Sequence, residues 1–379
     1  MPERNKPRKG LVIGISAVAG SLLVIVAFLT LNNDFLRSGG SPGASQIISP
    51  NDEAAKSIVP LDQIVSGGPA RDGIPSIDNP KFVSTEDAGL QDSDLILGLN
   101  INGDIRAYPL KILVWHEIVN DEVGGTPVTV TYCPLCFTNQ VFNRTIDGQT
   151  VEFGTSGKLY NSNLVMYDRT SESLWSQALG QAIVGERAGK KLERIPFDVA
   201  FWREWKALYP ETKVLSQDTG FGRPYGIDPY GDYYTNPDIL FPLSYHDDRL
   251  RVKEIVIGVE NDDKHKAYCV ADIESKKIVN DEIEGKQIAL VSLQPFMVRV
   301  FDRTVSLENN SNVTLEFEYD SSSNLLIDKQ TGTKWNFDGQ AIEGKMKGKS
   351  LTRLPFDEGF WFSWVAFHPD TSVYGRQQQ

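Results

Sequence analysis

The chain carries the stretch Ile118-Val119-Asn120-Asp121-Glu122 and repeats it, about 160 positions later, as Ile278-Val279-Asn280-Asp281-Glu282. Further motifs follow each stretch in the same order. They are Val141-Phe142-x-Arg144, Gly180-Gln181-Ala182-Ile183, Arg194-x-Pro196-Phe197-Asp198 and Phe201-Trp202-x-x-Trp205 in copy one, and Val300-Phe301-x-Arg303, Gly339-Gln340-Ala341-Ile342, Arg353-x-Pro355-Phe356-Asp357 and Phe360-Trp361-x-x-Trp364 in copy two. A series kept in fixed order at near-constant spacing indicates an internal duplication. The sequence therefore predicts one fold, built twice.

The duplication separates scaffold from candidate function, because each position can be compared with its own repeat. Tryptophans at shared positions are expected in the core: Trp175 and Trp335, Trp202 and Trp361, Trp205 and Trp364. Three residues able to do chemistry occur in copy one alone: His116, Cys133 and Cys136 align with Lys276, Leu293 and Phe296. We therefore expect the functional site in copy one.

Local signals predict an α+β fold of two tandem, related, mainly antiparallel β modules with about two helices each. Asn102-Gly103 and Asp147-Gly148 favour hairpin turns, because both pairs tolerate the positive φ angles of a tight turn. Pro109 suits the first position of a helix, and the apolar stripe from Leu110 to Ile118 predicts that this helix ends near Asn120.

The chain divides into three predicted parts. Residues 1–45 are a cytoplasmic tip, a transmembrane anchor and a flexible linker; residues 46–250 are module one, and residues 251–379 are a degenerate second copy. Residues 217–250 have no equivalent in copy two and are rich in tyrosine and phenylalanine, unlike a linker. We expect this insertion to pack across module one or to wall a cleft.

The net charge and the N-terminus restrict the partners of the protein. The 379 residues carry a formal net charge of −12, which argues against nucleic-acid binding because that function needs a concentrated basic face. Residues 11–31 lack charge and are long enough to cross a bilayer. Arg4, Lys6, Arg8 and Lys9 precede this run, so we expect a single-pass cell-membrane anchor with a cytoplasmic N-terminus and the bulk of the chain extracytoplasmic. A cleaved signal peptide is the alternative.

Several motifs of copy one resemble a known family. They are Tyr108-Pro109-Leu110-Lys111-Ile112-Leu113-x-Trp115-His116-Glu117, Tyr132-Cys133-Pro134-Leu135-Cys136, Phe153-Gly154-x-Ser156-Gly157 and Asn163-Leu164-Val165-Met166-Tyr167-Asp168-Arg169. Together they resemble the bacterial and archaeal family of domains of unknown function numbered 3179, over residues 60–245. The resemblance implies that module one is a recognisable unit and that export is typical of it, but it supplies no activity, cofactor or catalytic residue.

Cys133-x-x-Cys136 is the sharpest local signal. Two thiols at this spacing can bind one soft metal, form a disulfide or act as a redox pair. A thioredoxin fold would place a long helix after the motif, whereas a β-rich stretch follows here. In an exported protein the pair can also be a structural disulfide that holds a turn. The residues leave these alternatives open.

His116 is the expected third partner of the cysteines, because it precedes the strand that leads into them. Two thiolates and one imidazole suit copper or zinc, and Glu117, Asp168 or water would complete the coordination. Glu117 can instead orient the imidazole or act as a general base, which makes it the candidate catalytic residue.

Three functions remain open at this point. The first is a membrane-anchored extracytoplasmic protein with a copper or zinc site at His116, Cys133 and Cys136. The second is a thiol-disulfide or cysteine-dependent enzyme that uses the same cysteines, and the third is a non-catalytic envelope binding module with a structural disulfide. Whether the protein is an enzyme, and which small molecule or protein is its partner, does not follow from the sequence. His265 and His368 of copy two are interpreted as incidental.

Overall fold

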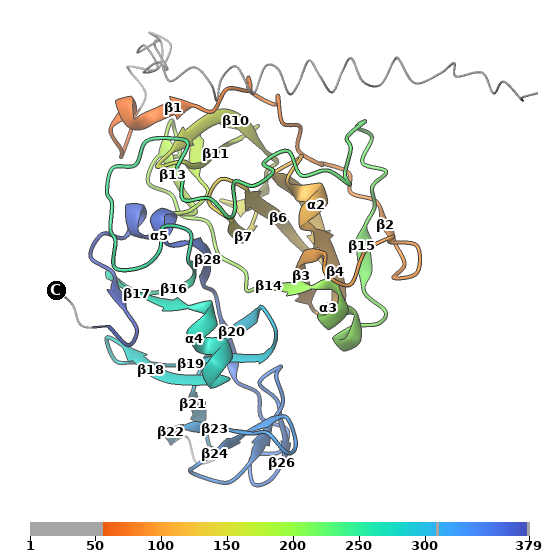
Figure 1. The fold of residues 1–379 in the computed structure, drawn as a ribbon, viewed down its shortest axis with the longest axis vertical. Coiled ribbons are helices and arrows are strands. Elements are labelled where there is room, and N and C mark those ends of the chain that lie inside the picture. The colour runs from red at the N-terminus through yellow and green to blue at the C-terminus, as the bar shows by residue number, and fades with distance from the viewer. Residues whose placement is uncertain (1–55, 308–310, 377–379) are drawn as a thin grey trace, which may run out of the picture. The chain divides into compact units, whose positions relative to one another are not determined.

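The computed structural model describes residues 56–307 and 311–376, all within one compact unit (Figure 1). The predicted membrane anchor and linker, residues 1–45, lie outside this part. Within the described ranges, the helices are all too short or too polar to cross a bilayer. The predicted boundary between the two modules, at residues 250 and 251, stays a prediction, because both copies belong to the same compact unit.

Copy one runs from the N-terminal turn to the strand after its second helix. Its elements are η1 (Leu61–Gln63), β1 (Ile64–Ser66), β2 (Phe82–Val83), β3 (Leu95–Ile101), β4 (Asp104–Pro109), α2 (Leu110–Leu113), β5 (Ile118–Val123), β6 (Thr126–Cys133), β7 (Thr138–Asn143), β8 (Thr145–Ile146), β9 (Gln149–Thr150), β10 (Phe153–Tyr160), β11 (Asn163–Asp168), β12 (Leu174–Ser176), β13 (Gln181–Val184), β14 (Asp198–Phe201), α3 (Trp202–Leu208) and β15 (Lys213–Leu215).

Copy two repeats this order from its first strand onward. Its elements are β16 (Ile255–Asn261), β17 (Lys264–Cys269), α4 (Val270–Lys276), β18 (Ile278–Ile283), β19 (Lys286–Gln294), β20 (Met297–Asp302), β21 (Thr304–Ser306), β22 (Asn312–Thr314), β23 (Phe317–Asp320), β24 (Leu325–Asp328), β25 (Lys334–Trp335), β26 (Ala341–Glu343), β27 (Thr352–Leu354), β28 (Asp357–Phe360), α5 (Trp361–Phe367) and β29 (Ser372–Val373). The described residues are thus mainly β with few helices, as predicted.

The hairpin predictions are confirmed. Asn102 and Gly103 have φ angles of 52° and 82° between the paired residues Ile101 and Asp104. Asp147 and Gly148, with φ angles of 53° and 78°, join β8 to β9 in the same way. Two consecutive positive φ angles give the turn the twist of the flanking antiparallel strands.

The predicted helix ending near Asn120 is wrong in its length. Helix α2 ends at Leu113, and Ile118–Val123 forms strand β5 instead, paired with β6. The helix cannot continue through Glu117, because the φ angle of this residue is 57° and a right-handed helix needs a negative φ. Lys277, the equivalent residue in copy two, has a φ angle of 66° after α4, so this break belongs to the shared scaffold.

Buried polar contacts recur at equivalent positions in the two copies. Trp175 Nε1 and Trp335 Nε1 each donate over 2.9 Å to the aspartate that ends the neighbouring strand, Asp168 and Asp328. The amides of Asn120 and Asn280 each donate over 2.8 Å to the carbonyl of a phenylalanine, Phe153 and Phe317. The shared motifs are therefore scaffold, and the suggestion that Asp168 could be a metal ligand is wrong, because its oxygens bind Trp175, a serine-rich turn and Arg187.

The two copies interlock through their repeated Arg-x-Pro-Phe-Asp motifs. Arg353 of copy two donates to Asp198 of copy one over 2.7 Å, and Arg194 of copy one donates to Asp357 of copy two. The rings of Phe197 and Phe356 pack between these pairs, with centroids 5.0 Å apart. Strand β28 also joins β7, which merges strands of both copies into the sheet β29-β17-β16-β28-β7-β6-β5 (Figure 1).

Two strand glycines allow the helices to pack on the sheets. A Cβ atom added at Gly98 would lie 2.5 Å from the Trp205 ring, and one at Gly258 would be as badly placed against Trp364. We expect Gly98→Ala and Gly258→Ala each to lower the free energy of unfolding by about 1–3 kcal/mol, because the tryptophan has to leave its place. Urea titration measures this, with Gly222→Ala as the control, since open space surrounds Gly222. Equal stability of all three variants would contradict the packing argument.

Candidate functional site

The cysteines lie in the turn that joins β6 to β7. Cys133 is the last residue of β6 and pairs with Thr138, the first residue of β7. Thr131 of β6 is paired with Gln140 of β7. The segment between these two residues is one residue longer than the segment between the equivalent pair of β19 and β20 in copy two. Phe137 and Phe296 both have positive φ angles, 53° and 63°, so Phe296 corresponds to Phe137. The alignment of Cys136 with Phe296 was therefore off by one, and Cys136 belongs to the longer turn of copy one.

The two thiols touch each other and are not crosslinked. Cys133 and Cys136 are free, and their exposed fractions are 1% and 0%. Burial raises the pKa of the Cys133 thiol well above its usual range, and the hydrogen bond with the Cys136 thiol raises it further. The Cys136 thiol donates to the carbonyl of Ser162 over 3.2 Å. Both sulfurs are thus shielded from solvent.

Glu117 is the acidic neighbour of this pair. Its side chain is buried, and burial followed by the nearby Cys133 raises the pKa of its carboxyl well above the usual range. Its main-chain carbonyl accepts a hydrogen bond of 2.9 Å from the Tyr132 amide, one residue before Cys133. Burial therefore favours the protonated form of this carboxyl, which lies close to the Cys133 thiol.

His116 belongs to a different set of contacts. Its Nδ1 lies 2.7 Å from the carbonyl of Pro75 and its Nε2 lies 2.7 Å from the Tyr225 hydroxyl. The Pro75 carbonyl can only accept, so Nδ1 carries the proton and Nε2 accepts from Tyr225. The Tyr225 hydroxyl in turn accepts from Thr219 over 2.5 Å. Burial lowers the pKa of His116, which keeps the imidazole neutral.

The predicted copper or zinc ligand set is not assembled. Across residues 56–307 and 311–376, the side chains of His, Cys, Asp and Glu form no group of three or more that could hold a metal ion. Both ring nitrogens of His116 are already engaged, by Pro75 and Tyr225. We expected His116 near the cysteines because it precedes the strand that leads into them, but neighbouring side chains point in different directions and it is Glu117 that lies beside Cys133.

The aromatic insertion covers the cysteine turn. Residues 217–250 connect β15 to β16 without a helix or strand, and Figure 1 shows them as the green segment between these strands. We call residues 228–236 of this insertion the lid. The hydroxyl of Tyr233 in the lid donates to the carbonyl of Leu135, between the cysteines, over 2.9 Å. Lys253 in turn lies 3.3 Å from the centre of the Tyr233 ring.

Copy two also contacts this turn. The Phe360 amide of β28 donates to the Cys136 carbonyl over 2.8 Å. Its ring stacks on that of Phe137, with centroids 5.5 Å apart. The candidate site therefore has three parts, namely the turn of copy one, the lid and strand β28 of copy two.

Comparison with known proteins identifies the family. A family model described as "Protein of unknown function (DUF3179)" matches residues 71–371. The chain belongs to the DUF3179 family. Neither a curated protein nor a solved structure was found that matches it. The matched range extends far beyond residues 60–245, so the DUF3179 unit includes both copies, which agrees with the contribution of β28 to the site.

Sequence reasoning missed which residues of this DUF3179 protein surround the thiols. Tyr230 lies near both Glu117 and Cys133, and the main chain of Leu164 hydrogen-bonds to Cys133. The aromatic composition of residues 217–250 was the only available signal, and it correctly indicated packing across module one. The sequence contained no equivalent signal for Leu164.

Loosening the lid is expected to expose the thiols. Tyr233→Phe removes the hydrogen bond to Leu135, which contributes about 0.5–1.5 kcal/mol, so lid opening and the rate of alkylation should rise about two- to tenfold. Mass spectrometry of the iodoacetamide reaction measures this rate. The control is Tyr245→Phe, which changes an exposed tyrosine of the same insertion. An unchanged rate in Tyr233→Phe would show that the lid does not control access.

Proposed function

We propose that Cys133 and Cys136 form a thiol–disulfide exchange site, carried on the extracytoplasmic side of a membrane. The observation that supports this most is the contact between two uncrosslinked thiols beside the buried carboxyl of Glu117. Two neighbouring thiols at the two ends of a short turn are the pair that a disulfide would join. Our proposal includes the anchor predicted at residues 11–31, which would hold the site in a compartment where disulfides persist.

The exchange requires a partner disulfide and balances without a metal. One cysteine thiolate attacks a sulfur of the partner, which forms a mixed disulfide and releases one partner thiol. The second cysteine then attacks the mixed disulfide, which forms the Cys133–Cys136 bond and releases the other partner thiol. The two protons of the cysteines end on the two partner thiols, and Glu117 relays one of them. The site is oxidised by two electrons and the partner is reduced.

The site is at rest while the lid covers it. The thiolate is the nucleophile, and burial under the lid disfavours it, because burial raises the pKa of Cys133. Displacing Tyr230 and Tyr233 admits water and the partner at once, so the pKa falls when the substrate arrives. The contact between Tyr233 and Leu135 therefore makes lid opening part of the reaction.

The test measures the redox state and the metal content of one sample of full-length protein in detergent. The protein is equilibrated with mixtures of reduced and oxidised glutathione, alkylated and mapped by mass spectrometry, and metals are measured by elemental analysis. We expect one two-electron transition that forms the Cys133–Cys136 bond in metal-free protein. Thiols that remain reduced at every ratio, or a disulfide that cannot be reduced in the folded state, would refute exchange. Stoichiometric copper or zinc that is lost in Cys133→Ser would support the metal site instead.

A further inference from the structure

Lys253 stands at a position where the two copies differ. It lies two residues before β16, and Ser93 lies at the same place before β3. The two places are equivalent, because the first amide of α3 donates to the carbonyl of Asp94 and the first amide of α5 donates to that of Glu254, one residue further on in each copy. Copy one carries the cysteine pair and lacks this amine, whereas copy two carries the amine and lacks the pair.

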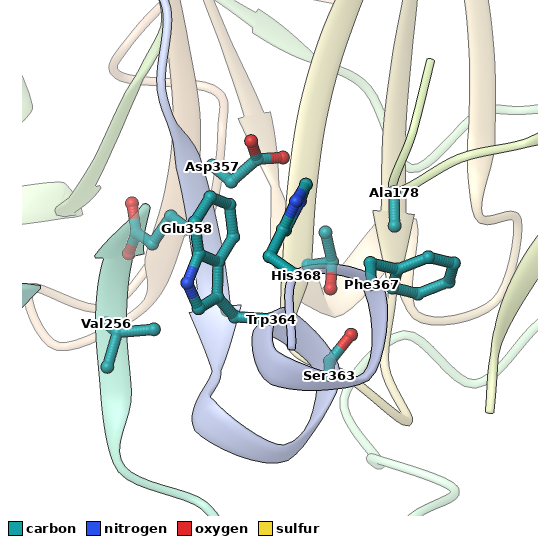
Figure 2. A pocket seen from close by; sticks show the side chains of 10 residues that line it. Ala178, Val256, Asp357, Glu358, Ser363, Trp364, Phe367 and His368 are labelled. Carbon is teal, nitrogen blue, oxygen red and sulfur yellow. The ribbon is translucent and has the colours of Figure 1, made fainter. Parts of the chain in front are cut away.

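Helix α5 holds the backbone of Lys253 in place. Its first two amides donate to the carbonyls of Glu254 and Val252, over 2.8 and 3.0 Å, on either side of the lysine. The helix is itself packed on β16, where its Trp364 ring lines a small pocket together with Val256 (Figure 2). The lysine side chain therefore starts from the body of copy two, not from the insertion that it contacts.

The side chain of Lys253 crosses to the lid and holds Tyr233 there. Its Nζ donates to the main-chain carbonyl of Tyr233 over 2.5 Å and to the side-chain oxygen of Asn236 over 3.3 Å. The same ammonium lies 3.3 Å from the centre of the Tyr233 ring, a close cation–π contact. The hydroxyl of this ring donates to Leu135, between the cysteines. Lys253 thus fixes the lid residue that bonds to the cysteine turn.

The ammonium of Lys253 has no directly bound counter-ion. Both of its acceptors are uncharged oxygens, and it forms no ion pair with a carboxylate of residues 56–307 or 311–376. Asp238 and Asp232 of the insertion act on it from further away. Partial burial outweighs them and lowers the pKa of Lys253 to about 8, the direction expected for a cation without a counter-ion. A carboxylate at this point gains a charge-assisted hydrogen bond that the protein itself does not supply.

We propose that Lys253 binds a carboxylate of the partner that carries the disulfide, and that this contact opens the lid. A carboxylate accepts a stronger hydrogen bond from an ammonium than a carbonyl or an amide oxygen does. It therefore takes Nζ from Tyr233 and Asn236, and the lid loses its attachment to copy two. The identity of the partner rests on the proposed exchange, but the carboxylate site itself requires no reaction.

The inferred partner is acidic beside its disulfide. Only an open lid lets a carboxylate reach Nζ while a sulfur reaches the thiols, so binding of this partner shifts the lid towards the open state. A disulfide without the carboxylate reacts only with those molecules whose lid is already open. Copy two thereby selects the partner for the thiols of copy one.

Two alkylating reagents of similar size test the carboxylate site without any disulfide. Iodoacetate carries a carboxylate and iodoacetamide a neutral amide, and mass spectrometry gives the rate of each at Cys133 and Cys136 of the full-length protein in detergent. The ratio of the two rates is divided by the ratio for N-acetylcysteine amide, a free thiol in the same buffer. We expect the wild type to favour iodoacetate by about two- to fivefold at low salt, and this preference to fall as salt is added.

Variants of the lysine separate its charge from its surroundings. Lys253→Met should lose the preference, and Lys253→Arg should keep it because arginine restores a cation. Lys264→Met, at an exposed lysine of the same copy, is the control that should change nothing. The same ratios are measured in Tyr233→Phe, whose lid is expected to be looser, so that a tightly closed lid cannot hide the result. Equal ratios with and without Lys253 in both backgrounds would overturn the proposal.

Two disulfide compounds separate this proposal from the exchange reaction. Pre-reduced protein is mixed with dithiodipropionate, which has a carboxylate on each side of its disulfide, or with the neutral hydroxyethyl disulfide, and both rates are divided by those of dithiothreitol. Faster oxidation by the dianion that is lost in Lys253→Met supports an acidic partner, and equal rates overturn it. Oxidation by neither compound, with the iodoacetate preference intact, would refute the exchange while still supporting the carboxylate site.

Discussion

Replacing Arg299 by alanine is expected to lower the free energy of unfolding by about 3–5 kcal/mol. The guanidinium and the Asp198 carboxyl are each 2% exposed, and they form two hydrogen bonds of 2.9 Å. Removing the arginine leaves Asp198 buried with Arg353 alone, and it also takes a donor from the Phe337 carbonyl and the Tyr209 hydroxyl. Urea titration followed by tryptophan fluorescence measures the change, because Trp205 and Trp335 are buried in the same core cluster.

The duplication supplies a matched control for this variant. Gln140 occupies the equivalent position in copy one, where its amide donates to Asp357. Gln140→Ala removes a neutral donor, so we expect a loss of about 1–3 kcal/mol, smaller than that of Arg299→Ala. If the two variants lose the same stability, the charge of Arg299 contributes nothing beyond an ordinary hydrogen bond. That result would contradict the expected role of the buried ion pair between Arg299 and Asp198.

Replacing either cysteine of the turn by serine is expected to abolish disulfide exchange. Neither Cys133→Ser nor Cys136→Ser can form the internal disulfide, so the cycle stops at a mixed disulfide with the partner. In a single turnover of pre-reduced protein with a fluorescent dithio peptide, and with no other thiol present, the wild type should release both peptide thiols, whereas each variant should release at most one. The trapped mixed disulfide is visible by mass spectrometry.

Cys269 provides the control for this experiment. It is a buried thiol of copy two, at the end of β17, and burial raises its pKa to about 11. Cys269→Ser should leave the exchange rate unchanged. Wild-type rates in Cys133→Ser and Cys136→Ser would remove the cysteine pair from the reaction, and loss of activity in Cys269→Ser alone would move the site to copy two.

The sequence predicted the parts of the fold that repeat or that depend on local chemistry. Asn102-Gly103 and Asp147-Gly148 determine their own turns, and the repeated tryptophans were correctly placed in the core. The helix after Pro109 was predicted too long, because apolar residues at Val114 and Ile118 suit a helix and a buried strand equally. Pairing of Ile118 with Thr131 decided between them, and that contact is not encoded locally.

The candidate site could be predicted only in part. The comparison of the copies singled out a segment in which Glu117 and Cys133 do lie together beside Cys136. The sequence did not indicate the contacts of His116, because a side chain follows the path of its backbone, and the turn before β5 directs His116 towards Pro75 and Tyr225. The contribution of β28 was hidden because copy two was interpreted as degenerate.

The exchange of arginines between the copies has a consequence for the history of the chain. Each Arg-x-Pro-Phe-Asp motif stabilises the other copy, Arg194 through Asp357 and Arg353 through Asp198. Such reciprocity is the geometry of an isologous homodimer, here joined into one polypeptide. Deleting either half would leave an arginine and an aspartate of the other half without their partners. The half without cysteines thus has a structural reason to stay joined to the half that has them.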